Sequence, residues 1–418
     1  MEPELAPSVT GRGFFLNIPM KTLKSSGVAS LLLAFAFALS TAHAQITLSP
    51  ELAKTVAAAQ GLMAEGKNVE ALSKLDDIKN VDAMPASERA LVERLTTAAA
   101  FGAKRNDRVI PSARYLALNS NLPPEDKGKF MEVLVGAYQG MKNNADLIQA
   151  ARAYYGSGGQ NPAIRLPLAQ ALAIEGQYQS ALDELALKKK SDQEAGAKPS
   201  EAQLRVAIFA NSKLKNDVGL IAALKDVLAL YPKPDYWSDM VGALFRTRNL
   251  TKRQEMDIYR LMEQLGQLVD EEDYLEMMDT ALKVGLPNDV LRLAAQLEKG
   301  KTLTADTRAK LTTFKQRAQT AAADDEKFKK IQPKSGNEWA QLADLHASEG
   351  SFERALDLYA NALKAGDLKY EQETKLHYAI ALFKAGRVPQ AQPILSTIAG
   401  PTPTPTTQLS ELWGLLIR

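Results

Sequence analysis

Few residues in this sequence have the types and spacing that catalysis requires. Ser212 begins Ser212-Lys213-Leu214-Lys215, the S-x-x-K pattern of acyl-enzyme nucleophiles, but no K-T-G partner follows it. Ser157 lies in Tyr155-Gly156-Ser157-Gly158-Gly159, which follows an expected helix rather than a strand. That context indicates a flexible turn and not a nucleophile elbow, which needs a strand before it. Neither serine therefore predicts acyl transfer.

The histidines and the short motifs predict no metal, nucleotide or cofactor site. Of the three histidines, His43 lies near the N-terminus, while His346 and His377 lie on helix faces where a packed structural role is expected. The sequence contains no H-E-x-x-H, no cysteine and no EF-hand loop, and it has neither G-x-x-x-x-G-K-[ST] nor G-x-G-x-x-G. We expect no catalytic residue, no metal and no cofactor, and the chain is interpreted as a non-enzyme.

The charge of the chain is close to balance. It has 51 basic and 49 acidic residues and a formal net charge of +2. Nucleic-acid and anionic-membrane partners require a basic excess or patch, so neither partner is predicted. The run Lys188–Lys190 is interpreted as a solvated helix terminus, and the acidic run 270–273 as the first turn of a helix, where the dipole favours negative charge.

The N-terminal 44 residues carry a secretion signal. Lys21 and Lys24 precede the apolar run 28–39, and Ala42-His43-Ala44 matches the small-x-small cleavage site. Residues 1–44 are thus predicted to form the signal-peptide region, with Met20 as the true translation start. Cleavage is predicted between Ala44 and Gln45. The alternative is an uncleaved anchor, but a run of about twelve residues is short of the ~20 that span a bilayer.

The rest of the sequence predicts a soluble periplasmic product. Without cysteine the chain cannot be a lipoprotein acylated at that residue, and no second apolar run approaches membrane-spanning length. We therefore expect localisation in the periplasm and no integral membrane span after processing. With 45% hydrophobic and 24% charged residues, the composition is that of a folded protein.

Almost the whole mature chain shows apolar residues at helical spacing. Apolar positions recur at i, i+3, i+4 and i+7, and short polar turns with Gly, Pro or Asn separate the segments. We predict an all-α fold, a right-handed α-solenoid of antiparallel helix pairs over 45–400. Its clearest repeats lie near 52–78, 162–188, 337–366 and 372–398.

The repeats share one frame, which is sharpest in 337–366. With the turn glycine as the origin, an alanine lies seven residues before it and another five residues after it. This triplet occurs four times, as Ala59, Gly66 and Ala71, as Ala169, Gly176 and Ala181, as Ala343, Gly350 and Ala355, and as Ala379, Gly386 and Ala391. The small alanines are expected where two helices cross closely. Larger residues are expected to fill the grooves between pairs, namely Trp339, Leu342, Phe352 and Tyr359, and Tyr178 and Ala362 are further positions of the repeat signature.

These positions resemble the tetratricopeptide repeat. The last two turn glycines are 36 residues apart, close to the family period of about 34. The unit 337–366 departs from the pattern at His346, where the family usually has an aromatic residue, and at Asp367, where proline is common. Degenerate pairs are predicted near 86–118, 124–156, 200–231, 236–264 and 304–332.

The C-terminal residues 401–418 are predicted to form a linker and a helix. Pro401-Thr402-Pro403-Thr404-Pro405 indicates a stiff extended linker. Leu409, Leu412, Trp413, Leu416 and Ile417 then follow an amphipathic pattern. This helix is expected either to cap the open end of the array or to bind a partner.

Two segments resemble the tetratricopeptide proteins found with TonB energy-transducing systems in Gram-negative bacteria. The segment 229–244 contains Tyr231-Pro232-Lys233 followed by Tyr236-Trp237, and 271–294 continues the likeness. The resemblance implies a non-catalytic periplasmic scaffold that mediates protein–protein interaction, with TonB-complex components as partners in its concave groove. The alternatives are an envelope assembly factor and the solenoid arm of a cell-wall hydrolase, although the latter would need a catalytic domain that this chain has no room for.

Overall fold

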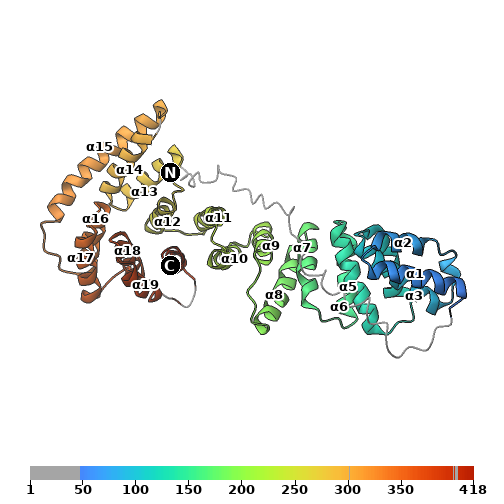
Figure 1. Cartoon of the computed structure of the whole chain (residues 1–418). Coiled ribbons are helices and arrows are strands. Elements are labelled where there is room, and N and C mark those ends of the chain that lie inside the picture. Colours follow the sequence, from blue (N-terminus) through green and yellow to red (C-terminus); the bar gives the residue numbers. More distant parts are fainter. Residues whose placement is uncertain (1–47, 301, 399, 401–402) are drawn as a thin grey trace. The chain divides into compact units, whose positions relative to one another are not determined.

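The structure is a computed structural model that describes residues 48–300, 302–398, 400 and 403–418. These ranges contain twenty α-helices and no strand, and consecutive helices pack as pairs (Figure 1). This helical content and consecutive pairing confirm the all-α solenoid that helical periodicity predicts. The predicted signal peptide, with its start at Met20 and its cleavage between Ala44 and Gln45, lies outside the described residues.

The described chain divides into two compact units after Asn216, whereas the helical periodicity predicts one array over 45–400. The first unit has one apolar core that extends along it from Leu52 to Val206. Its helices are α1 (Pro50–Ala64), α2 (Asn68–Asp76), α3 (Ala86–Gly102), α4 (Asn106–Arg114), α5 (Pro124–Gly140), α6 (Asn144–Gly156), α7 (Arg165–Ile174), α8 (Tyr178–Glu194) and α9 (Glu201–Lys213).

The second unit covers 217–418 and contains the remaining helices. They are α10 (Asp217–Leu230), α11 (Pro234–Phe245), α12 (Lys252–Gln264), α13 (Glu271–Lys283), α14 (Pro287–Gly300), α15 (Ala305–Phe328), α16 (Gly336–Ser348), α17 (Phe352–Ala365), α18 (Glu371–Lys384), α19 (Val388–Ser396) and α20 (Pro405–Leu416).

One turn geometry recurs between the helices of a pair. After α1, Gly66 adopts φ +76°, and the amide of Lys67 donates to the carbonyl of Leu62 at 2.8 Å. This is a Schellman cap, which satisfies carbonyls that the helix end leaves without partners. The same positive φ and the same bond to the residue five places earlier occur at Gly176, Gly285, Gly350 and Gly386.

Three further turns of this kind have lysine where the sharper repeats have glycine. Lys104, Lys142 and Lys215 have φ between 54° and 56°, and each is followed by the same backbone bond. A side chain costs about 1–2 kcal/mol in this left-handed region, which glycine avoids. The degenerate units therefore keep the turn geometry of the sharper repeats at the expense of backbone strain.

The alanines of the predicted frame are all buried, as expected for positions where two helices cross. None of the eight is more than 1% exposed. Those seven residues before the turn glycine are Ala59, Ala169, Ala343 and Ala379, and those five residues after it are Ala71, Ala181, Ala355 and Ala391. Each of the eight lies within one of the paired helices, so both helices of every sharp repeat contribute a small buried residue.

The helix-crossing positions are also buried where no alanine occupies them. In the units with lysine at the turn, and in the unit at Gly285, bulkier residues occupy the equivalent places. They are Thr97 and Val109, Val135 and Leu147, and Met278 and Val290, and all are buried. These positions are therefore buried in all of these units, whereas alanine occupies both of them only in the sharp repeats.

One predicted helix pair is wrong. In place of a pair over 304–332, the chain forms the single helix α15, which has 24 residues. The physical reason is local, since 305–328 contains no Gly, Pro or Asn at which a turn could form. Although α15 is the longest helix, neither it nor any other helix in the described ranges has the length and apolar character that a membrane span requires.

The second unit folds back on itself through α20. This helix packs on α18 and α19 and also on α10 and α12, and Figure 1 places the C-terminus beside them. Its buried face consists of Leu409, Leu412, Trp413 and Ile417. Lys225 of α10 pairs with Glu411 at 2.7 Å, so helices from the start and the end of the unit are in contact.

Candidate binding site

A cluster of buried charged side chains joins three helices of the second unit. Asp257 of α12 is 0% exposed, and Asp344 of α16 and His377 of α18 are also buried. The Nδ1 atom of His377 is 2.7 Å from Oδ1 of Asp344, and its Nε2 atom is 2.8 Å from Oδ1 of Asp257. A carboxylate can only accept hydrogen bonds, so both ring nitrogens donate and the ring is an imidazolium.

The electrostatics of the cluster favour this charged state. Burial alone lowers the pKa of His377, but the attraction of Asp257 and Asp344 outweighs burial and raises the pKa to about 9. Burial likewise raises the pKa of Asp344, but His377, Arg253 and Arg260 outweigh it and hold that pKa well below its ordinary range. His377 thus carries a positive charge at neutral pH and bridges two carboxylates.

Two arginines of α12 complete the pairing around this bridge. Arg253 donates from Nε to Glu373 at 2.9 Å and from Nη2 to Asp344 at 3.3 Å. Arg260 lies 3.2 Å from Oδ1 of Asp257 through Nη1. Because residues of α12 thereby contact residues of α16 and α18, the cluster joins helices that lie far apart in the sequence.

A tyrosine and a second layer of ion pairs support the cluster. The hydroxyl of Tyr359 donates to Oδ1 of Asp344 at 2.7 Å. Asp289 lies 3.7 Å from Arg260 and accepts from Nη2 of Arg292 at 2.9 Å, and Arg292 also pairs with Glu263. Buried ions are tolerated when they are paired and hydrogen-bonded in this way.

Two carboxylate oxygens of the cluster have no hydrogen-bond donor, Oδ2 of Asp257 and Oδ2 of Asp289. Both contacts of Asp257 with His377 and Arg260 reach Oδ1, whereas Oδ2 is buried and has no hydrogen-bond partner. Leaving a buried acceptor without a donor costs about 1–3 kcal/mol, and more when the group is charged.

Asp257 also lines a cavity of about 310 Å³ between α12, α16 and α18. Asp344, Arg260 and His377 line it as well, and its wall is completed by the buried apolar residues Met256, Leu286 and Ala340. Residues on the exposed side are Asn337, Gln341, Lys369 and Tyr370. Lys369 and Arg253 both lie against the Tyr370 ring, at 5.0 and 5.4 Å from its centroid.

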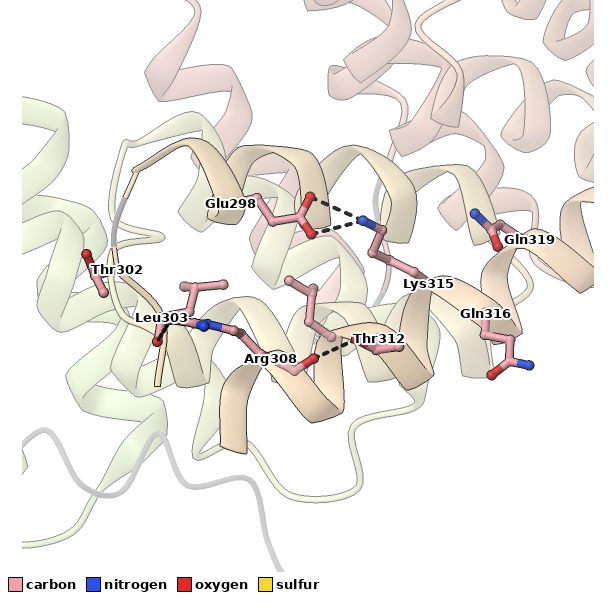
Figure 2. A pocket seen from close by; sticks show the side chains of 9 residues that line it. Glu298, Thr302, Leu303, Arg308, Thr312, Lys315, Gln316 and Gln319 are labelled. Carbon is pink, nitrogen blue, oxygen red and sulfur yellow. Dashed lines mark hydrogen bonds and ion pairs between the residues drawn. The ribbon is translucent and has the colours of Figure 1, made fainter. Parts of the chain in front are cut away.

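A larger groove of about 710 Å³ runs between α14 and α15 (Figure 2). Its polar groups bond to one another. Lys315 bridges both oxygens of Glu298 at 2.9 and 3.2 Å, Arg308 donates to the carbonyl of Leu303, and Thr312 donates to that of Arg308. The walls are mostly exposed. The smaller cavity, which is lined by members of the buried charged cluster, is the better candidate site.

The residues predicted from the repeat pattern lie mainly in the packed core. Leu342, Tyr359 and Ala362 are buried, and Tyr178, Trp339 and Phe352 are half-buried. Tyr359 alone among them contacts the charged cluster. The eight frame alanines, including Ala71, Ala181 and Ala391, lie at helix crossings and do not line the cavity. The repeat signature therefore has a structural role and does not mark a binding site.

The other residues considered for chemistry are not among those that line the cavity. Ser157 caps the turn after α6 by donating to the carbonyl of Tyr154. His346 lies 3.6 Å from Glu349 near the surface. The structure does not bring Ser157, Ser212 and His346 together with the cavity.

Sequence reasoning missed the charged cluster. Arg253, Asp257 and Arg260 are spaced i, i+4 and i+7, so they share one face of α12. The same spacing is common on solvated helix faces, and only their partners on other helices distinguish them. Among the described residues, no group of three or more His, Cys, Asp or Glu side chains is placed to hold a metal ion.

Comparison with known proteins does not assign this chain to a family. No protein-family model matches it, and neither does any curated protein. One solved structure that it resembles is the crystal structure of Ton1535 from Thermococcus onnurineus NA1, at 14% identity over 87% of this chain and 99% of that one. The TM-score of 0.20 is too low for that likeness to carry an argument.

Proposed function

We propose that this chain is an exported, non-catalytic tetratricopeptide-like scaffold that binds other proteins in the periplasm. The observation that carries the proposal is the recurring capped turn with its two buried crossing positions, in the sharp and the degenerate units alike. Stacked helix pairs of this kind present extended inner surfaces, which helical-repeat proteins use to hold peptides or helices. In the second unit a cavity lies between α12, α16 and α18.

The finer proposal is that the partner belongs to a TonB energy-transducing complex. The likeness of 229–244 and 271–294 to tetratricopeptide proteins of those systems supports it. Tyr236 and Trp237 of that likeness are buried in α11, so they stabilise the fold, and other residues must contact the partner.

Export is tested by expressing the full chain in a Gram-negative host and sequencing the N-terminus of the periplasmic product. A product that begins at Gln45 supports the proposal. An intact N-terminus that stays in the membrane fraction would contradict it.

Partner binding is tested with a photo-crosslinking amino acid at Gln341, an exposed residue that lines the cavity. The matched control places the same amino acid at Lys310, an exposed residue of α15 outside the cavity. Crosslinks from position 341 to purified periplasmic domains of TonB-complex proteins, without crosslinks from position 310, are expected. Equal or absent crosslinking at both positions would overturn the TonB proposal.

A further inference from the structure

The turns that follow α1, α3, α5, α7 and α9 form one continuous edge of the first unit, which we call the turn edge. Contacts join each turn to the next, namely Asn68 with Gly102, Asn106 with Gly140, Asn144 with Glu175, and Tyr178 with Phe209. In the first two, an amide side chain packs so closely on a glycine that a Cβ atom would collide with it. The third is a hydrogen bond of 3.4 Å, and the fourth joins two rings whose centroids are 5.9 Å apart.

Three of these turns have lysine at the left-handed position. Lys104, Lys142 and Lys215 are exposed, and none of them forms an ion pair within the described part of the chain. The neighbouring Arg105, by contrast, pairs with Asp107 at 2.7 Å. Glycine would take the left-handed conformation without strain, so the fold does not require lysine there. Strained residues that the fold does not require point to a role at the surface.

Exposed apolar side chains lie beside these lysines. Met141 precedes Lys142 and is 52% exposed, Leu214 precedes Lys215 and is 39% exposed, and Ile174 lies at the turn between them. Single exposed apolar residues are ordinary on protein surfaces. Here, however, three of the six large apolar side chains exposed in the described part of the first unit lie within two residues of a turn position. The turn edge therefore combines unpaired positive charge with apolar side chains.

This combination fits a flat anionic surface that has an apolar layer beneath its charge. A lysine can lay its stem along apolar groups while its ammonium stays with polar ones. Anionic lipid headgroups attract basic side chains, and the boundary beneath them accepts apolar side chains. Several turns along one edge can meet a flat surface at once. The two cavities described above, which suit a side chain of a partner better, both lie in the second unit.

We propose that the turn edge of the first unit binds the surface of a membrane that contains anionic lipids. The three lysines contact lipid phosphates, and Met141 and Leu214 enter the boundary between headgroups and acyl chains. The nearly balanced charge of the whole chain does not reveal this edge, because only the fold brings the three turns together. This inference goes beyond the scaffold function and does not depend on it.

The test is cosedimentation of residues 45–418, which include every described residue, with lipid vesicles. The predicted signal region is left out because its apolar run would itself enter a bilayer. Vesicles of phosphatidylglycerol and phosphatidylcholine in equal amounts should bind the chain at least tenfold more tightly than vesicles of phosphatidylcholine alone. Binding should fall when NaCl is raised from about 0.05 to 0.5 M, because salt screens exposed charges. Equal binding to both kinds of vesicle, or binding to neither, would overturn the proposal.

The role of the lysines is tested by the triple variant Lys104→Gln, Lys142→Gln and Lys215→Gln. Each lysine near an anionic bilayer contributes a factor of about five to binding, so the triple variant should bind anionic vesicles at least tenfold more weakly. Arginine at the same three positions keeps the charge and should bind as the wild type does. All three side chains are exposed, and circular dichroism checks that the variants fold.

The matched control is the triple variant Lys54→Gln, Lys79→Gln and Lys198→Gln, which changes the net charge equally. These lysines are exposed but lie away from the turn edge, in the first half of α1 and in the loops after α2 and α8. The control should bind anionic vesicles as the wild type does. Equal losses in the two triple variants would show that net charge alone is responsible and would overturn the assignment to the turn edge.

The apolar contribution is tested by Met141→Ser combined with Leu214→Ser. Because each apolar side chain removed from water favours binding, the double variant should bind anionic vesicles at least about fivefold more weakly. Leu118→Ser combined with Leu187→Ser is the control, since both leucines are exposed but lie outside the turn edge. Equal binding of the two double variants would contradict entry of the turn edge into the bilayer.

An acidic protein is the competing partner, and poly-L-glutamate is the probe for it. If poly-L-glutamate binds through the three lysines and anionic vesicles do not bind, the turn edge serves an acidic protein and the membrane proposal is wrong. That result would leave the scaffold proposal standing, because crosslinking at Gln341 tests the second unit. Failed crosslinking with retained vesicle binding would remove the scaffold proposal alone.

Discussion

At the scale of single residues, His377 is a buried charged side chain that depends on its partners for stability. It is one cation between two buried carboxylates that come from different helices. Removing one member of a buried ion cluster leaves uncompensated charge, which is costlier than losing a surface pair. The two histidines among the described residues, His346 and His377, therefore form a natural pair of variants.

We expect His377→Gln to destabilise the second unit by about 3–5 kcal/mol, because Asp257 and Asp344 would face each other without the imidazolium. His346→Gln should change stability by no more than about 0.5 kcal/mol, as surface substitutions usually do. Urea unfolding followed by tryptophan fluorescence measures both, since Trp237, Trp339 and Trp413 all lie in the second unit. A loss below ~1 kcal/mol for His377→Gln would contradict the ionic cluster.

The stabilisation from His377 should depend on pH. Its pKa is raised from 6.5 to about 9, so folding favours the protonated ring. The stabilisation is fully present below about pH 6.5, declines as pH rises, and is lost above about pH 9. A shift of this size corresponds to roughly 3 kcal/mol.

The measurement is the difference in unfolding free energy between the wild type and His377→Gln across about pH 6 to 10, a range that brackets both pKa values. This difference should shrink as pH rises, and NMR of the ring should titrate near pH 9. A difference that grows with pH would have the wrong sign for this structure.

At the scale of elements, a glycine at the recurring capped turn has a different role from a glycine inside a helix. Gly176 has φ +75° with open space around its Cβ position, so Gly176→Ala should cost about 1 kcal/mol from backbone strain alone. Gly61 lies inside α1 without such a φ and also with open space. Gly61→Ala should therefore stabilise by about 0.5–1 kcal/mol.

The lysine turns provide the reverse test. Lys142→Gly should be between neutral and about 1 kcal/mol stabilising, since relief of strain exceeds the added flexibility of the unfolded chain. Far-UV circular dichroism in urea follows all three variants, because the first unit has no tryptophan. The same sign for Gly176→Ala and Gly61→Ala would disprove the role of the left-handed turn.

The helix crossings in 337–366 are tested by overpacking. Ala343 and Ala355 are both fully buried, and leucine at either position should cost about 1–3 kcal/mol. Ala365, exposed at the end of α17, is the control position for the same substitution. Fluorescence-detected unfolding that is unchanged for both buried variants would contradict close crossing of α16 and α17.

At the scale of the whole molecule, α20 determines how the second unit closes. The amphipathic pattern of this helix leaves open whether it caps the array or binds a partner. In the structure it packs on α18 and α19 at the end of the array and also on α10 and α12. It thus caps the end of the array and also joins the unit's last helices to its first ones.

Truncation of the α20 core should therefore destabilise the unit as a whole. Leu409 is 0% exposed, and Leu409→Ala should cost about 2–5 kcal/mol. Lys225→Gln removes only the exposed pair with Glu411 and should cost no more than about 1 kcal/mol. Tryptophan fluorescence in urea distinguishes the two, and equal small effects would show that α20 contributes little to closure.

Sequence by itself determined the features that depend on neighbours along the chain. Helical periodicity identified the helices, and glycine at the left-handed turn with alanines seven before and five after identified the sharp repeats, because each signal lies within a few helical turns. The same locality explains one miss. The absence of any helix breaker over 305–328 removed a predicted pair.

Only the tertiary structure decided the candidate site. Asp257 and His377 are 120 positions apart, and nothing in either local pattern distinguishes a buried charge from a solvated one. Their contact requires α12, α16 and α18 to lie together, which follows from how the second unit closes through α20. Burial then changes the chemistry, because a carboxylate and an imidazole that would titrate independently in water form an ion pair at neutral pH beside a cavity.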